Sequence, residues 1–181
     1  MLSIFAAEAL LPDGWAKDVR IRIDGATITA VEQDTVLDKG DERHAIVVPA
    51  MPNLHSHAFQ RGMAGLAEIR GFSADSFWSW RETMYRFALA MTPAEVEAVA
   101  AQLYVEMLES GFCRVGEFHY LHHDRDGRPY GNIAEMAERI AAAAGATARR
   151  LSSSMRANRV VSLTNRRWLS FGAAPPKVEC A

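Results

Sequence analysis

A His-Ser-His triplet at positions 55–57 follows a short apolar stretch at residues 45–48. The apolar stretch indicates a buried strand of a parallel sheet, and two prolines bracket its exit because proline cannot donate to a sheet ladder. Side chains at positions i and i+2 of a strand share one face, so the two imidazoles are expected side by side. Ring nitrogens at this spacing can reach one divalent ion, which makes His55 and His57 candidate metal ligands.

The spacing alone leaves an alternative, a surface histidine pair that binds nothing, because two imidazoles fill only half of a tetrahedral zinc site. A strand with prolines at its exit and this triplet at its end resembles the opening strand of the metal-dependent amidohydrolase superfamily. In that superfamily the paired histidines close the first strand of a (β/α)8 barrel and bind the metal. The resemblance therefore implies an α/β fold whose site lies at the carboxyl ends of the strands.

The first 44 residues are expected to form a small β-module. Residues 19–23 and 27–31 alternate apolar and polar side chains, and the Asp24-Gly25 dipeptide between them favours a tight hairpin. Residues 34–44 are polar and are expected to form a loop. Segment 1–44 resembles the small N-terminal β-sandwich that many amidohydrolases carry beside the barrel, although any antiparallel module would give the same hairpin pattern.

Helix and strand signals then alternate along residues 45–145. A capping box at residues 92–95 begins one expected helix, and residues 112–118 follow it as a strand. Residues 132–144 form a second expected helix with Gly145 as its stop. This alternation is typical of a parallel fold, and we interpret it as the first two βα units of a (β/α)8 barrel. The 181 residues are too few for a complete barrel of ~250 residues.

The composition changes abruptly after residue 145. Seven basic residues and one acidic residue follow, whereas the whole chain carries a net charge of −2. Residues 146–181 are therefore expected to be a basic tail outside the family pattern, either disordered in solvent or produced by a shifted reading frame. We favour the reading-frame interpretation, because a barrel cannot close after two βα units.

Composition also indicates the cellular location of the chain and the partners it binds. The net charge of −2 gives no reason to expect a nucleic-acid partner. No apolar run reaches the ~18 residues of a membrane span, and no signal peptide is visible. Cys113 and Cys180 do not make a disulfide framework. These features predict a cytoplasmic protein that binds neither nucleic acid nor membranes.

Three longer strings narrow the resemblance to one family. They are MPNLHSHAFQRGMAGL at residues 51–66, SFWSWRETMYRFA at residues 76–88 and VGEFHYLHHDRDGRPY at residues 115–130. They resemble the formimidoylglutamate deiminase family, which acts in histidine degradation. The resemblance implies hydrolysis of a formimino C–N bond, which converts N-formimino-L-glutamate to N-formyl-L-glutamate and ammonia. It also implies one Zn²⁺ ion as the cofactor and a small molecule as the substrate.

The resemblance carries site residues over by position. His55 and His57 match metal ligands, whereas Gln60, Arg81 and Tyr120 match substrate contacts. An arginine fork suits the glutamate carboxylates of the substrate. Three histidines of the third string receive no role: His119, His122 and His123.

The family takes its remaining metal ligands and its proton-transfer residues from later strands. We therefore predict no catalytic residue within this chain and expect it to be inactive, and we leave a homodimer of a full-length form open. Two alternatives remain. One is another amidohydrolase deaminase, of guanine or cytosine type, which shares the histidine pair. The other is a non-catalytic truncated fragment that binds metal weakly.

Overall fold

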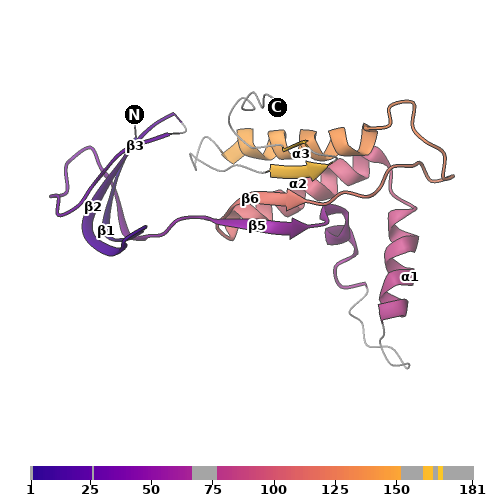
Figure 1. Cartoon of the computed structure of the whole chain (residues 1–181), viewed down its shortest axis with the longest axis horizontal. Helices are drawn as coiled ribbons and strands as arrows, with labels where there is room; N and C mark the ends of the chain where they lie inside the picture. Colours follow the sequence, from indigo (N-terminus) through magenta and orange to yellow (C-terminus); the bar gives the residue numbers. More distant parts are fainter. Residues whose placement is uncertain (1, 26, 67–76, 152–160, 165–166, 169–181) are drawn as a thin grey trace, which may run out of the picture.

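Two four-stranded sheets form the framework of the molecule (Figure 1). The first sheet holds the N-terminal strands, and helices accompany only the second sheet. A single extended stretch of chain joins the two parts (Figure 1). The structure, a computed structural model, describes residues 2–25, 27–66, 77–151, 161–164 and 167–168, with side chains up to residue 147.

The first sheet confirms the predicted hairpin. Its strands stand in the order β3-β2-β1-β4. Strand β1 pairs antiparallel with β2, which pairs antiparallel with β3, and Gly25 between β2 and β3 has a φ of +58° that favours glycine. The described residues of this region form one sheet, so the expected sandwich stays a prediction. The bounds are β1 Leu2–Leu11, β2 Gly14–Asp24, β3 Thr27–Glu32 and β4 Glu42–Val47.

The prediction that residues 45–48 form the buried strand leading to the histidines was wrong. Residues 45–47 belong to β4, which pairs in parallel with β1 at the edge of the first sheet. Ile46 of β4 is 61% exposed, and Val48, which follows the strand, is 54% exposed, so this apolar stretch is not buried. A separate strand, β5 (Met51–Ser56), carries His55. A short apolar run specifies a strand, but its partner is set by contacts distant in sequence.

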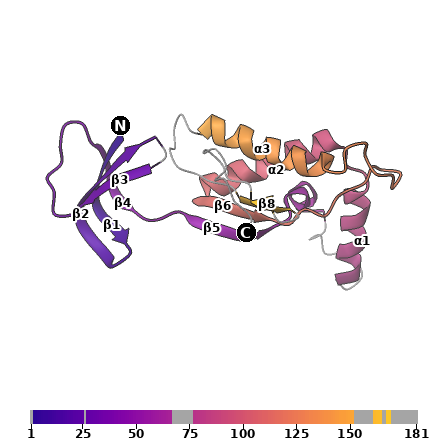
Figure 2. The same ribbon diagram turned by 45° about the horizontal axis from the view of Figure 1, so that its top comes forward.

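The second sheet has the strand order β5-β6-β7-β8. Strands β5, β6 and β7 run parallel, and β8 returns antiparallel to β7. Helices α2 and α3 pack against each other along one face of this sheet, whereas α1 runs across their direction (Figures 1 and 2). The bounds are η1 Ala58–Met63, α1 Phe77–Ala88, α2 Pro93–Glu109, β6 Phe112–Glu117, α3 Glu135–Leu151, β7 Val161–Thr164 and β8 Arg167–Trp168.

Helix α2 begins where the sequence predicts, at the capping box of residues 92–95. The Thr92 hydroxyl accepts a hydrogen bond from the Glu95 amide at 3.3 Å, and the Glu95 carboxylate accepts one from the Thr92 amide at 2.7 Å. Both amides would otherwise lack an intrahelical partner, so this reciprocal pair fixes the helix start. Gly111, with a φ of +86°, follows the last turn and redirects the chain into β6.

Helix α3 corrects two expectations about the end of the chain. Gly145 does not stop the helix, which continues to Leu151. A glycine inside a helix costs only about 1 kcal/mol, and the buried Ala143 and Ala144 pack in the core beside it. The predicted tail therefore starts inside a helix, and residues 161–164 add a strand beside β6. Most of segment 146–181 lies outside the described residues.

The main core lies between the helices and the second sheet. Val96, Ala100 and Tyr104 of α2 are fully buried, and they share one cluster with Met136 and Ile140 of α3. Burial of this apolar surface is the main force that holds α2 and α3 together. No helix among the described residues is long and apolar enough to cross a membrane.

Replacing Met136 with alanine is expected to destabilise the chain by about 2–5 kcal/mol, because Met136 is 2% exposed and its loss leaves a cavity. Urea denaturation followed by circular dichroism measures the change. Ile133→Ala is the matched control, since Ile133 is 80% exposed and its truncation should change stability by less than about 0.5 kcal/mol. Equal losses in the two variants would contradict the described packing of α3.

Candidate functional site

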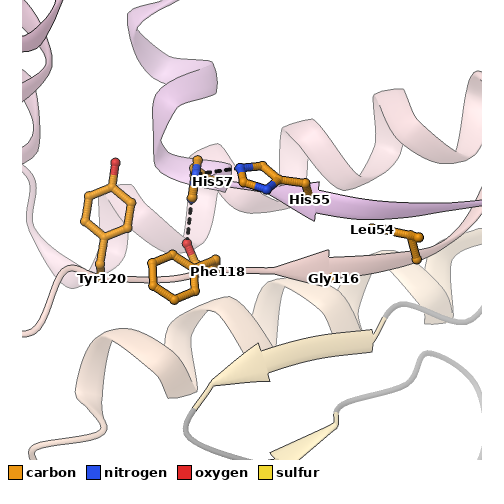
Figure 3. Close-up of a pocket in the computed structure, with 6 residues that line it drawn as sticks. All are labelled: Leu54, His55, His57, Gly116, Phe118 and Tyr120. Atoms are coloured by element: carbon orange, nitrogen blue, oxygen red, sulfur yellow. Dashed lines mark hydrogen bonds between the residues drawn. The ribbon is translucent and has the colours of Figure 1, made fainter.

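Strands β5 and β6 bring two distant segments to one edge of the second sheet. They run parallel, with Ser56 opposite Glu117 in the register. Their carboxyl ends therefore meet, so the residues after β5 lie beside the residues after β6. In α/β folds this edge is the usual place for ligand sites. The candidate site contains His55 and His57 from the end of β5 and Phe118 and Tyr120 from the end of β6 (Figure 3).

The two imidazoles converge on each other through their outer nitrogens. The Nε2 atoms of His55 and His57 are 2.9 Å apart, with the ring planes at 85° (Figure 3). Nδ1 of His57 lies 2.8 Å from the carbonyl oxygen of Phe118. A carbonyl oxygen only accepts hydrogen bonds, so we assign the proton of neutral His57 to Nδ1. Nε2 of His57 then keeps its lone pair, which is the form that binds a metal.

This pair fits as two ligands of one metal ion. Two imidazoles on a tetrahedral zinc, with Zn–N bonds of about 2.0–2.1 Å, place their nitrogens about 3.3 Å apart. The observed 2.9 Å reaches that separation with a small rotation of the rings. No cluster of three or more histidine, cysteine, aspartate or glutamate residues suited to a metal occurs in the described part of the chain. The pair can therefore fill at most two of the four positions of a tetrahedral metal site.

Tyr120 and Gln60 lie beside the histidine pair. The Gln60 amide donates to the Tyr120 hydroxyl at 3.0 Å, and the Tyr120 ring stands 5.2 Å from the His57 ring. The hydroxyl also lies 3.3 Å from the sulfur of Met84 in α1. Burial raises the pKa of Tyr120 above its ordinary value. The hydroxyl is therefore neutral at pH 7 and can donate a hydrogen bond to a ligand beside the imidazoles.

Arg81 is the predicted site residue that stands apart from this cluster. It lies exposed on α1, where its guanidinium carbon is 5.6 Å from the Trp78 ring centroid and 5.0 Å from that of Tyr85. The guanidinium also donates to the Tyr85 hydroxyl at 3.3 Å. None of these contacts joins Arg81 to His55, His57 or Tyr120. The structure thus brings His55, His57, Gln60 and Tyr120 together and leaves Arg81 on the neighbouring helix.

A pocket of about 550 Å³ opens between the ends of the two strands. Position 116 has no room for a side chain. A Cβ atom there would lie 2.8 Å from the carbonyl oxygen of Leu54 and would clash with it. Glycine is therefore required at this close approach. The volume suits a small molecule. The lining residues are Leu54, His55, His57, Gly116, Phe118 and Tyr120 (Figure 3).

Glu117 is a buried acid at this edge that sequence reasoning did not single out. It is 1% exposed, and its Oε1 atom accepts a hydrogen bond from the Ala58 amide at 2.6 Å. Burial raises the pKa of the Glu117 carboxyl, and the hydrogen bond from Ala58 opposes this rise. The available signal was the single acid of β6, at a buried position where a carboxylate needs a specific partner.

His119 is buried next to the pocket strand but does not line the pocket. It is 6% exposed, and its ring lies 4.9 Å from that of His122. Burial, followed by the charge of His122, lowers the pKa of His119 to about 4. His122 and His123 are exposed. The structure therefore separates the three histidines to which the sequence gave no role into one neutral buried ring and two solvated ones.

Acid is expected to destabilise the fold through His119. Its pKa is about 4 when folded and about 6.5 when unfolded. The unfolded chain thus takes up the proton first, and about 3 kcal/mol of stability is lost as pH falls from 6.5 to 4. Urea denaturation of the wild type and of His119→Gln across this range measures the difference. His123→Gln, at an exposed position, should follow the wild type, and a His119→Gln profile parallel to the wild type would contradict the burial.

Comparisons with known proteins find similarity to deiminases and deaminases. A family model described as the formimidoylglutamate deiminase HutF N-terminal domain matches residues 1–45. The chain is 52% identical over 147 residues to a formimidoylglutamate deiminase of Pseudomonas aeruginosa. The matched stretch covers 81% of this chain and 32% of the relative. It is 27% identical over 124 residues to a 5-methylthioadenosine/S-adenosylhomocysteine deaminase of Haloarcula marismortui, covering 66% of this chain and 28% of that relative.

Solved structures give the same grouping. An amidohydrolase from Brucella melitensis matches with a TM-score of 0.80 and 60% identity, over 90% of this chain and 34% of that structure. Atrazine chlorohydrolase TrzN from Arthrobacter aurescens, complexed with zinc, matches with a TM-score of 0.61 over 90% of this chain and 35% of that structure, and its 20% identity supports the fold alone. The chain spans about a third of the length of these relatives. Over this part of their length, the chain is similar to a formimidoylglutamate deiminase and to a solved amidohydrolase.

Proposed function

We propose that this chain supplies the N-terminal part of a metal-dependent hydrolase that converts N-formimino-L-glutamate to N-formyl-L-glutamate and ammonia. The observation that carries the proposal is the convergence of the His55 and His57 Nε2 atoms, 2.9 Å apart, at the carboxyl end of β5. The name of the relative that is 52% identical supports the choice of substrate.

The proposed framework is the start of a (β/α)8 barrel with a small N-terminal β-module. Parallel strands β5 and β6, with α2 and α3 along one face, have the arrangement of the first βα units of such a barrel. The similarity in fold to the complete amidohydrolase from Brucella melitensis supports this reading. In the complete barrel, later strands would continue the sheet and add their own residues at the same edge.

His55 and His57 would hold a divalent metal ion, and zinc is the first candidate because a neighbour of the same fold is complexed with zinc. Such an ion lowers the pKa of a bound water to about 7 and so supplies hydroxide at neutral pH. Within the chain, the Phe118 carbonyl holds Nδ1 of His57 at 2.8 Å and so orients the ring. Neutral imidazole, exposed at His55 and partly exposed at His57, is the ligand form that such a site requires.

Gln60, Tyr120 and Arg81 would contact the substrate. The Tyr120 hydroxyl and the Gln60 amide are already paired at 3.0 Å beside the His57 ring, where they can orient the formimino group by hydrogen bonds. Arg81 would bind a glutamate carboxylate through two parallel hydrogen bonds. Its guanidinium lies against the Tyr85 and Trp78 rings, which hold it on one side of α1.

The chain alone is expected to release no ammonia. Among the described residues, no third histidine, cysteine, aspartate or glutamate joins His55 and His57 in a group suited to a metal ion. The partner of the complete enzyme is a small molecule. A cytoplasmic location and a homodimer remain predictions from the sequence.

A hybrid enzyme tests the proposal. Residues 1–145 of this chain are joined to the later part of the Pseudomonas aeruginosa relative, and ammonia release from N-formimino-L-glutamate is measured with added zinc. Identity of 52% should allow the two parts to fold together. The hybrid is expected to turn over, whereas the 181-residue chain by itself is not. A folded, zinc-loaded hybrid without this activity would contradict the proposal.

A second candidate function is a deaminase of guanine or cytosine type. The 27% identity to a 5-methylthioadenosine/S-adenosylhomocysteine deaminase favours it, because that relative acts on a substrate class without a glutamate side chain. The same hybrid assayed with guanine, cytosine and S-adenosylhomocysteine separates the two candidates. Faster turnover of any of these than of N-formimino-L-glutamate would favour the second.

A further inference from the structure

We propose that Glu117 is a positioning residue for the histidine pair, acting through the backbone amide of Ala58. This inference rests on the proposed function, in which His55 and His57 bind the metal. Glu117 lies on β6, and its hydrogen bonds do not go to either imidazole. One of its hydrogen-bond partners is Ala58, the residue that follows His57 in the chain.

Glu117, the last residue of β6, and Phe118, which follows it, hold the two residues that follow β5. The Glu117 carboxylate accepts from the Ala58 amide at 2.6 Å, and the Phe118 carbonyl accepts from His57 Nδ1 at 2.8 Å. The Phe118 amide in turn donates to the Ser56 carbonyl at 2.8 Å. The backbone before His57, its ring and the backbone after it are therefore each bonded to Glu117 or Phe118 at the end of β6.

The backbone at this point needs an external acceptor. The short helix η1 begins at Ala58 directly after His57, which has φ of −130° and ψ of 83° and makes no side-chain cap. The first amides of a helix have no partner within it. Glu117 supplies that acceptor from the neighbouring strand, so the direction in which the chain leaves β5 is fixed. That direction sets where the Cβ atom of His57 points, and hence where its ring lies.

The length of the side chain, and not its charge, is the property that this role requires. Ala58 is fully buried and Glu117 is 1% exposed, so water cannot replace the bond. A glutamine has the same length and keeps an acceptor oxygen for the Ala58 amide. An aspartate keeps the charge but is one methylene shorter and cannot reach the amide without a shift of the backbone. Glu117→Gln and Glu117→Asp therefore separate positioning from an electrostatic effect on the site.

Zinc titration of the complete 181-residue chain tests the inference. Isothermal titration gives the apparent zinc affinity, and imidazole ¹⁵N shifts give the share of His57 in the Nδ1–H form without metal. Glu117→Gln should match the wild type within about twofold. Glu117→Asp should bind zinc roughly 10- to 100-fold more weakly and lose the fixed Nδ1–H signal, as expected when a partner that orients a ligand is removed.

The outcomes are distinguishable. The positioning role of Glu117 would be overturned if both variants bound zinc with wild-type affinity, or if only Glu117→Gln lost zinc affinity. Circular dichroism checks that each variant is folded. If Glu117→Asp does not fold, Glu117→Gln decides alone, and a tenfold or greater loss there refutes the inference. His55→Ala reports on the proposed function separately: if it binds zinc as well as the wild type, the histidine pair is not the metal site. The ¹⁵N signal of His57 still tests the role of Glu117 in that case.

Discussion

Replacing His57 with alanine in the hybrid enzyme should lower kcat/KM for N-formimino-L-glutamate by roughly 10³-fold, because the metal loses one of its ligands and its bound water is no longer activated. This loss corresponds to about 4 kcal/mol in the activation barrier. Ammonia release at saturating and limiting substrate gives kcat/KM, and metal analysis of the purified protein gives the zinc content. Both are expected to fall together.

The chain offers a matched control for this variant. His44 lies on β4 in the first sheet, where it is partly exposed and its Nε2 atom lies 3.0 Å from a carboxylate oxygen of Glu42. His44→Ala removes the same ring from another sheet and should leave both zinc content and turnover unchanged. A hybrid in which His57→Ala retains its zinc and more than a tenth of its activity would remove His57 from the metal site.

Replacing Arg81 with alanine in the hybrid should raise KM for N-formimino-L-glutamate by roughly 10- to 100-fold, with a smaller effect on kcat. A hydrogen bond to a charged group contributes about 1.5–3 kcal/mol, and this bond binds a part of the substrate distant from the reacting carbon. Arg81→Lys should recover only part of the loss, because an ammonium group cannot form the two parallel bonds of a guanidinium. Steady-state kinetics with all variants measure these changes.

Arg86 provides the control for Arg81, since it is an exposed arginine on the same helix. Arg86→Ala should leave KM near the wild-type value. Equal KM changes in the two variants would mean that α1 contributes only general positive charge, and an unchanged KM in Arg81→Ala would leave the substrate carboxylates to residues elsewhere in the enzyme.

Local sequence patterns predicted the parts of the fold that depend on neighbours in the chain. The capping box at Thr92 and Glu95, the hairpin around Gly25 and the strand before Phe118 are all present. The capping box and the hairpin depend on contacts within a few residues, so the pattern contains the necessary information, whereas the pairing of the strand before Phe118 with β5 is a distant contact. The spacing of His55 and His57 is a feature of the same kind, and their outer nitrogens do converge.

Features that depend on distant contacts were not predictable in this way. Strand β4 pairs with β1 across 38 or so residues, and its apolar run looks the same in either sheet. The bond from Ala58 to Glu117 joins residues that are 59 apart. Gly145 was expected to end α3, but the packed alanines beside it outweigh its weak helix propensity. Tertiary packing decides all three.

The short separation of His55 and His57 has a consequence for thermal-shift experiments. Because the two rings stay near each other in any extended chain, a denatured molecule retains much of its ability to capture zinc. A ligand that binds both states stabilises the native one only by the ratio of the two affinities. The rise in melting temperature with zinc should therefore be modest. It should reflect how much more tightly the folded chain, in which the Phe118 carbonyl orients His57 across 61 residues, binds zinc than the denatured chain does.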